Sequence, residues 1–246
     1  MKTLLSILIL AAVIVTSAVA NEQTVALDRA PDRTRDLAAL QRGARFFVNY
    51  CLNCHSANQM RYSRLRDIGI SAQEVESNLL FTADKVGKMM NIAMRVDDAK
   101  AWFGTDAPDL SLEARARGRD WLYTYLRSFY RDDTRPTGWN NLVFENVAMP
   151  HVLWQLQGQR TLQSEGESSV GHDIGQKNIG YRQLTPGTLS PMDYDSAVAD
   201  LVSYLVWMAE PVQQQRKRLG VWVIVFLSVL SLFAWRLNVN YWKEIK

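Results

Sequence analysis

The amino-acid sequence predicts a mainly α-helical protein with long loops and one C-terminal transmembrane helix. Apolar residues recur every three or four positions over residues 35–56 and again over residues 195–209, as on one face of a helix. A run without charged residues extends from Leu219 to Trp235. Residues 132–191 show little periodicity, which predicts the long loops.

Residues 35–56 contain the clearest predicted helix. Its apolar stripe consists of Leu37, Leu40, Ala44, Phe47, Val48 and Cys51. The helix therefore leads directly into the string Cys51-Leu52-Asn53-Cys54-His55.

The rest of this domain is predicted to alternate between helices and loops. We expect helices over residues 71–96 and 112–131, the second interrupted or kinked near Gly118. Residues 97–108 are expected to form a loop between them. The last helix of the domain should end before Pro211, because proline cannot continue a helix.

The first 20 residues have the pattern of a secretory signal peptide. Lys2 provides a positive start, an apolar stretch follows, and Ala18-Val19-Ala20 fits the small-residue rule for cleavage. The mature chain would begin at Asn21. The alternative is an uncleaved N-terminal anchor, for which the apolar stretch is short.

Residues 216–237 are predicted to form a transmembrane anchor, with residues 238–246 as a cytoplasmic tail. Their apolar run is at the short end for a membrane span, and tryptophan and tyrosine side chains suited to the interface accompany it. With an export signal, residues 21–215 would form a periplasmic domain. We therefore expect a single-pass protein of a bacterial inner membrane, in contact with the lipid bilayer.

The charge of the chain differs between its segments. Residues 21–215 hold 21 lysines and arginines against 24 aspartates and glutamates, a net charge of −3, whereas the whole chain has a net charge of +3. The positive balance comes from the two terminal segments. Since the exported domain is mildly acidic, we expect no nucleic-acid partner.

The only two cysteines lie in the string Cys-x-x-Cys-His, at Cys51, Cys54 and His55. At this spacing two thiols add across the two vinyl groups of haem, and the histidine lies beneath the iron as its proximal ligand. We therefore predict one covalently bound haem c, with His55 as a metal ligand.

Three other readings of the cysteines are weaker. A disulfide between Cys51 and Cys54 would close a loop too small to stabilise much. A thioredoxin-like redox pair needs a preceding strand, whereas a helix is predicted here. A zinc site needs a second pair of ligands, and His151 and His172 are too isolated.

Several short strings follow the haem motif in a fixed order. They are Trp102-Phe103-Gly104, Pro108-Asp109-Leu110-Ser111, Arg115-Ala116-Arg117-Gly118, Trp121-Leu122-Tyr123, Pro136-Thr137-Gly138, Met149-Pro150 and Trp207-Met208-Ala209-Glu210-Pro211. This series, which covers nearly all of residues 35–246, resembles cytochrome c1, the haem subunit of quinol–cytochrome c oxidoreductase. Ala107 departs from the family pattern, which has a proline there.

The resemblance implies a class I cytochrome c-like haem domain. In that fold a glycine and an aromatic residue of the first helix cross the last helix, and Gly43 and Phe47 match these positions. Tyr204 or Trp207 would be the aromatic residue on the last helix.

The resemblance also implies the function and the partners. The domain would accept electrons from a Rieske iron–sulfur protein and pass them to a soluble or membrane cytochrome c, within a dimeric complex that contains cytochrome b. The chain would then be an electron carrier and not itself an enzyme. An anchored cytochrome c subunit of a terminal oxidase and a free-standing membrane cytochrome are the alternatives.

Further cofactor-binding residues follow from the same resemblance. Met149 occupies the place of the second iron ligand, and Met192 is the most serious competing methionine. Arg117, with Arg115 as a second candidate, would neutralise a haem propionate, although both also fit an exposed basic helix face. Pro108 completes the predicted haem-binding set.

Overall fold

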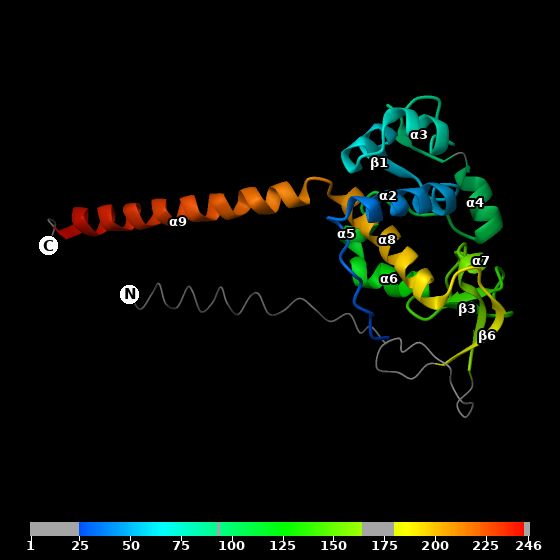
Figure 1. Cartoon of the computed structure of the whole chain (residues 1–246). Helices are drawn as coiled ribbons and strands as arrows, with labels where there is room; N and C mark the ends of the chain where they lie inside the picture. Colours follow the sequence, from blue (N-terminus) through cyan, green and yellow to red (C-terminus); the bar gives the residue numbers. More distant parts are fainter. Residues whose placement is uncertain (1–24, 93, 164–179, 244–246) are drawn as a thin grey trace.

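The computed structural model describes residues 25–92, 94–163 and 180–243, so the predicted signal peptide at residues 1–20 lies outside the described residues. A mainly helical head domain carries one long C-terminal helix that extends away from it (Figure 1). This architecture confirms the predicted fold class. Short antiparallel strand pairs and long loops complete the head.

The first and last helices of the head cross closely. They are α2 (Leu37–Phe46) and α8 (Pro191–Ala209). A Cβ atom placed on Gly43 would collide with the carbonyl oxygen of Asp200 and would lie 2.7 Å from Cβ of Tyr204. The ring centroids of Phe47 and Tyr204 are 5.6 Å apart, which confirms the predicted crossing of a glycine and an aromatic residue.

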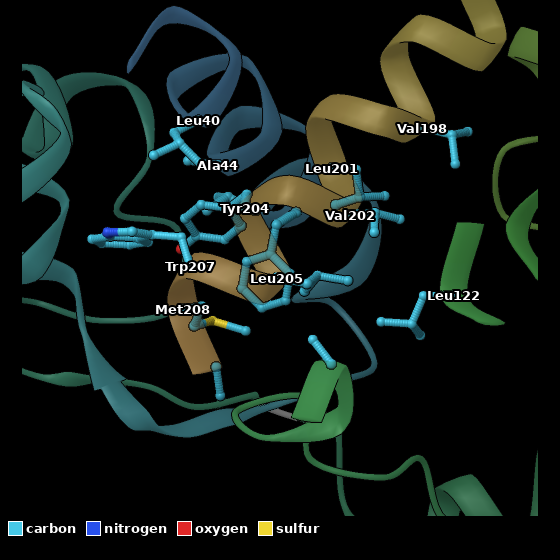
Figure 2. Packing of buried hydrophobic residues seen from close by; sticks show 14 of the residues in the cluster. Leu40, Ala44, Leu122, Val198, Leu201, Val202, Tyr204, Leu205, Trp207 and Met208 are labelled. Carbon is cyan, nitrogen blue, oxygen red and sulfur yellow. The ribbon is translucent and has the colours of Figure 1, made fainter. Parts of the chain in front are cut away.

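The main hydrophobic core lies along this crossing. Figure 2 shows the buried side chains of α8 packed beside Leu40 and Ala44 of α2, with Leu122 of α6 (Arg119–Arg127) at its edge. Burial of such side chains contributes on the order of 2 kcal/mol each to the free energy of unfolding.

The capping groups set where both helices begin. The Asp36 side chain accepts hydrogen bonds from the backbone N–H groups of Ala38 and Ala39 at the start of α2. Ser190 caps α8 in the same way, and Pro191 occupies the first turn. The last helix therefore begins four residues before the predicted Asp195, and it ends before Pro211 as predicted.

A π-helical turn, η1 (Phe47–Cys51), continues α2 to the first cysteine. The backbone N–H groups of Cys54 and His55 then donate to the carbonyl oxygen of Cys51 over 3.0 and 2.8 Å. These two bonds fold Cys54 and His55 back against the end of the helix.

The helix predicted over residues 71–96 is wrong for most of its length. Only α3 (Ala72–Asn78) forms there, started by a capping box between Ser71 and Glu74. Before α3, the chain forms strand β1 (Ala57–Arg61) and the 3-10 helix η2 (Tyr62–Ile68). After α3, turns lead to strand β2 (Met89–Met90), which pairs with β1. Met90 is buried on this strand, and the Tyr204 hydroxyl of α8 lies 4.0 Å from its Sδ atom.

The predicted loop at residues 97–108 is wrong in its first half. Helix α4 (Val96–Phe103) forms there, with Asp97 and Asp98 in its first turn, where acidic groups favour the helix dipole. It ends at Gly104, whose φ of +77° suits glycine.

The break at Gly118 is confirmed. It separates α5 (Glu113–Ala116) from α6, and its φ is +88°. The chain then leaves helical structure at Ser128 and enters β3 (Phe129–Arg131), so the predicted helix ends a few residues early.

The segment predicted as long loops contains short elements as well. Strand β4 (Trp139–Asn141) pairs with β3, helix α7 (Trp154–Gln157) follows, and β5 (Gly158–Leu162) pairs with β6 (Tyr181–Pro186). Residues 142–153 between β4 and α7 remain without a strand or helix.

The last element is α9 (Gln213–Lys243), a single helix of 31 residues. Within the described parts of the chain it is the one helix long and apolar enough to cross a membrane, and its side chains are not buried against the head. At 1.5 Å per residue it is roughly 46 Å long, enough to cross the hydrocarbon layer and both interfaces. The predicted anchor, residues 216–237, lies within it.

Candidate haem-binding cavity

A cavity of about 330 Å³ opens in the head between α6, α8 and two loop segments. Its walls are mainly apolar and aromatic, which suits a large flat organic group. These walls include Phe103, Trp121, Leu122, Tyr125, Leu126, Phe144, Val147, Val152, Leu201 and Leu205.

Cys51, Cys54 and His55 line the same cavity. Both cysteines are free thiols in the structure. Burial raises the pKa of Cys51 to about 12, so its thiol is protonated at neutral pH. The π-helical turn therefore places two thiols and an imidazole at one apolar cavity.

The imidazole of His55 is held by a backbone carbonyl. Its Nδ1 lies 2.8 Å from the carbonyl oxygen of Pro108. A carbonyl only accepts hydrogen bonds, so Nδ1 carries the proton and Nε2 retains its lone pair. Fixing the tautomer in this way is the usual preparation of a histidine for metal binding.

Pro108 also lines the cavity. Its contribution comes from the backbone. The proline itself has no N–H group and restricts the backbone that presents this carbonyl.

Met149 lies on the loop after β4 and lines the cavity. The hydroxyl of Tyr125 on α6 donates a hydrogen bond to its Sδ atom over 3.3 Å. Tyr125 in turn stacks on Trp121, with ring centroids 4.8 Å apart. The thioether is thus positioned by an aromatic pair on α6.

The other methionines of the head differ in position. Met192 is 80% exposed in the first turn of α8 and is not part of the cavity lining. Met60, Met90 and Met208 are buried in the core, whereas Met94 is half-buried and lines the cavity. Met149 and Met94 are thus the two methionines among the described lining residues.

The two predicted arginines are not brought together. Arg117 lines the cavity, stacks over Trp121 with its guanidinium carbon 4.8 Å from the ring centroid, and pairs with Glu113 over 3.5 Å. Arg115 is exposed and does not line the cavity. The structure therefore favours Arg117 at the cavity over Arg115.

His151 is separated from the cavity by its own packing. Its ring stacks on Phe129 with centroids 4.8 Å apart, and Nε2 lies 2.7 Å from Oε1 of Gln157. Burial lowers the pKa of His151 to about 3, so it is neutral. His172 lies outside the described residues.

The family model described as the cytochrome C1 family matches residues 29–245. The chain belongs to the cytochrome c1 family. Among its relatives, the cytochrome c1 of Allochromatium vinosum is 46% identical over 213 residues, which cover 86% of each chain. The mitochondrial cytochrome c1 of Saccharomyces cerevisiae is 26% identical over 88% of this chain and 70% of its own.

A further relative has a different name. A protein of Nitrosomonas europaea named ammonia monooxygenase gamma subunit is 47% identical over 223 residues, which cover 91% of this chain and 90% of its own. It is as similar to this chain as the Allochromatium cytochrome c1 is.

Cytochrome c1 is a haem-containing electron carrier of the bc1 complex of the respiratory chain, and it is not an enzyme by itself. It lies in the membrane in a complex with cytochrome b and the Rieske protein. The apolar helix α9 agrees with such an anchor. The resemblance drawn from the ordered strings is therefore confirmed.

The residues of the cavity fit a haem. An apolar space bordered by two thiols, an imidazole with a free Nε2 and a thioether supplies the donor set that c-type haem requires. The Arg117 guanidinium at the lining offers a positive charge for a carboxylate.

Sequence reasoning missed the aromatic support of the site. Tyr125 and Phe144 line the cavity but were not assigned a role. The spacing of Trp121 and Tyr125 by four residues on one helix was the available signal, because such residues share a face. Phe144 lies in a loop, where no periodicity marks it.

Proposed function

We propose that this chain is a membrane-anchored c-type cytochrome that takes electrons from the Rieske protein of its complex and passes them to a cytochrome c. The arrangement of His55 carries the proposal most directly. A histidine that follows two cysteines, lines an apolar cavity and has Nδ1 fixed by a carbonyl is prepared to bind iron through Nε2.

The side chains of this site would perform distinct tasks. Cys51 and Cys54 would each form one thioether bond, which fixes the position of the cofactor. His55 and Met149 would hold the metal from the protein side, and the apolar walls would exclude water. When bound, a haem supplies an iron that alternates between two oxidation states by one electron.

Arg117 is the proposed partner of a haem propionate. Its guanidinium already lies over Trp121 at the cavity lining, and a carboxylate would compete with Glu113 for it. Arg115 is a weaker candidate because it is exposed and does not line the cavity. Pro108 would act through its carbonyl oxygen.

The topology is proposed on the same grounds as the site. We propose that the chain is cleaved after residue 20. Residues 21–215 then form a periplasmic haem domain, residues 216–237 an anchor and residues 238–246 a cytoplasmic tail. This topology would place the cavity outside the cytoplasm, where c-type haem is attached. The continuous apolar surface of α9 supports a single crossing of a bacterial inner membrane.

The acceptor is proposed to be a basic soluble cytochrome c or a membrane-bound one. The net charge of −3 on residues 21–215 supports electrostatic attraction to a basic partner. The complex is proposed to be dimeric, as the family resemblance implies.

The name of the Nitrosomonas relative supports a second candidate, in which the chain would serve an ammonia monooxygenase. Its similarity to this chain equals that of the Allochromatium cytochrome c1. The haem site would be the same in both assemblies, so the partners distinguish the two functions.

Purification of the full-length chain from its own membranes in mild detergent tests the proposal. We expect cytochrome b and a Rieske protein to co-purify in equal amounts with it, together with quinol-dependent reduction of its haem. The chain is purified through an affinity tag, and membranes that contain the chain without the tag serve as the control. Recovery with monooxygenase or terminal-oxidase subunits, and without cytochrome b, would contradict the proposed function.

A further inference from the structure

A second cavity, of about 320 Å³, lies at the base of the head, where the chain enters α9. Its walls come from β1, η2, the residues before α5 and the C-terminal end of α8. Figure 1 shows β1 and α5 on the same side of the head as the start of α9. The cavity is therefore close to the expected membrane surface.

One part of this cavity is basic. Arg61 and Arg64 line it together with the amide side chain of Gln59, and the described lining contains no carboxylate. Arg61 donates to the carbonyl oxygen of Gly87 over 2.6 Å, and Arg64 pairs with Asp67 over 2.9 Å. Since a guanidinium has five N–H donors, each arginine retains donors for an anion.

The nearby acidic residue is already neutralised. Glu210 lies between two lining residues in the sequence, and its carboxylate binds Arg216 and the side-chain amide of Gln213. These bonds lower its pKa, so it is ionised and paired. The cavity consequently remains attractive to negative charge.

The other part of the cavity is apolar and leads toward the anchor. Leu112, Met208 and Pro211 line it. Leu112 and Val212 are 42% and 50% exposed, so an apolar path runs from the cavity to Val212, beyond which residues 213–218 are polar or basic. A basic pocket beside an exposed apolar path matches a molecule with a charged group and hydrocarbon chains.

The distances to the membrane agree with this match. Pro211 and Leu219 are eight positions apart, about 12 Å at the rise of a helix. The headgroup layer occupies roughly 5 to 7 Å beyond the hydrocarbon. The long, flexible side chains of Arg61 at the end of β1 and Arg64 in η2 can cover the remaining distance.

We propose that this cavity binds the phosphate headgroup of an anionic phospholipid, such as phosphatidylglycerol, from the leaflet on the side of the head. Arg61 and Arg64 hold the phosphate, and the acyl chains pass Leu112 and Val212 toward α9. The site is independent of the haem and of the electron-transfer partners, and it requires only that α9 lies in a membrane.

Native mass spectrometry of the delipidated full-length holoprotein tests this site. Phosphatidylglycerol and phosphatidylcholine are added in separate titrations, and bound lipid is counted. We expect Arg61→Gln with Arg64→Gln to weaken phosphatidylglycerol binding by about tenfold or more and to leave phosphatidylcholine binding unchanged.

A charge-matched variant distinguishes a site from general attraction. Arg66→Gln with Arg95→Gln removes two exposed arginines that do not line the cavity. This pair should keep phosphatidylglycerol binding within twofold of the parent. The proposal is overturned if both double variants lose phosphatidylglycerol binding equally. It is also overturned if inorganic phosphate alone saturates the site at the concentration at which phosphatidylglycerol does.

A photoreactive residue at position 112 identifies the occupant in intact membranes. Crosslinking to lipid is expected, whereas crosslinking to another protein subunit overturns the proposal. If the double arginine variant does not fold, as judged by covalent haem and by its melting temperature, Leu112→Trp replaces it. This change fills the apolar part from an exposed position and should weaken lipid binding, and unchanged binding overturns the proposal.

Discussion

The hydroxyl of Tyr125 donates a hydrogen bond to Sδ of Met149 over 3.3 Å. This bond links α6 to the loop after β4 and holds the thioether at the cavity. A donor at this sulfur withdraws electron density, which favours the reduced state of a metal bound to it.

Tyr125→Phe is therefore expected to keep covalent haem and to lower the reduction potential by on the order of tens of millivolts. Potentiometric titration measures the change. Tyr130→Phe, in which a tyrosine outside the cavity lining is altered, serves as the control and should leave the potential unchanged. A potential that stays constant in Tyr125→Phe would show that this bond is absent in the holoprotein.

Met149→Leu is expected to keep covalent haem, lower the potential and allow carbon monoxide to bind the iron, because leucine has similar volume and no donor atom. Met192→Leu is the matched control, since Met192 is 80% exposed. Optical spectra with and without carbon monoxide measure both variants. An effect of Met192→Leu without an effect of Met149→Leu contradicts the proposed ligand.

Gly43→Ala is expected to destabilise the head by about 1 to 3 kcal/mol, because the added methyl group meets the backbone of α8. Thermal unfolding measures the loss, and each kcal/mol corresponds to about 2 to 4 °C in a protein of this size. Gly87→Ala, at a glycine with open space around it, is the control. Equal melting temperatures for the two variants would mean that α2 and α8 can move apart without loss of stability.

Arg127→Gln is expected to lower the free energy of unfolding by roughly 3 to 5 kcal/mol, because it removes one member of a buried ionic network. The Arg127 guanidinium is buried and lies 2.6 Å from carboxylate oxygens of both Asp28 and Asp195. Urea denaturation measures the change. Arg45→Gln, at an exposed arginine, should change stability by less than about 0.5 kcal/mol.

The rate of electron transfer to a basic soluble cytochrome c is expected to fall as ionic strength rises, because residues 21–215 have a net charge of −3. Stopped-flow oxidation of the reduced protein over a series of salt concentrations measures this dependence. A rate independent of salt indicates an acceptor that docks through apolar contacts or is tethered.

The sequence predicted those parts of the fold in which a single physical requirement dictates the residue type. Such a requirement dictates the haem motif, the Gly43 crossing, the break at Gly118 and the apolar C-terminal helix. The structure contains the crossing, the break and the apolar helix as expected. Local chemistry was sufficient in these cases. The fold class followed from them.

The failures at residues 71–108 have a common origin. The spacing of apolar residues indicates which side chains are buried. It does not indicate whether the backbone at those residues is a helix, a strand or a turn. Met90 is buried on a strand that pairs with β1, and this pairing joins residues far apart in sequence. Helix α4 was missed because its short sequence has few buried side chains and hence no apolar stripe.

The candidate site was only partly predictable for the same reason. Cys51, Cys54 and His55 are adjacent, so their joint position followed from the motif. The carbonyl of Pro108 and the hydroxyl of Tyr125 act through contacts across the fold. Arg115 and Arg117 look equivalent in sequence, yet residues two apart on a helix do not share a face, and only Arg117 lines the cavity.

The crossing of α2 with α8 has a consequence for the order of events during synthesis. The two helices that enclose the core are among the first and the last parts of the head to leave the ribosome. Until residues 191–209 have been synthesised, α2 lacks its partner and the cysteine turn that ends it stays uncovered. The interval between these two events is the period in which an enzyme could reach both thiols, and closure of the last helix would end it.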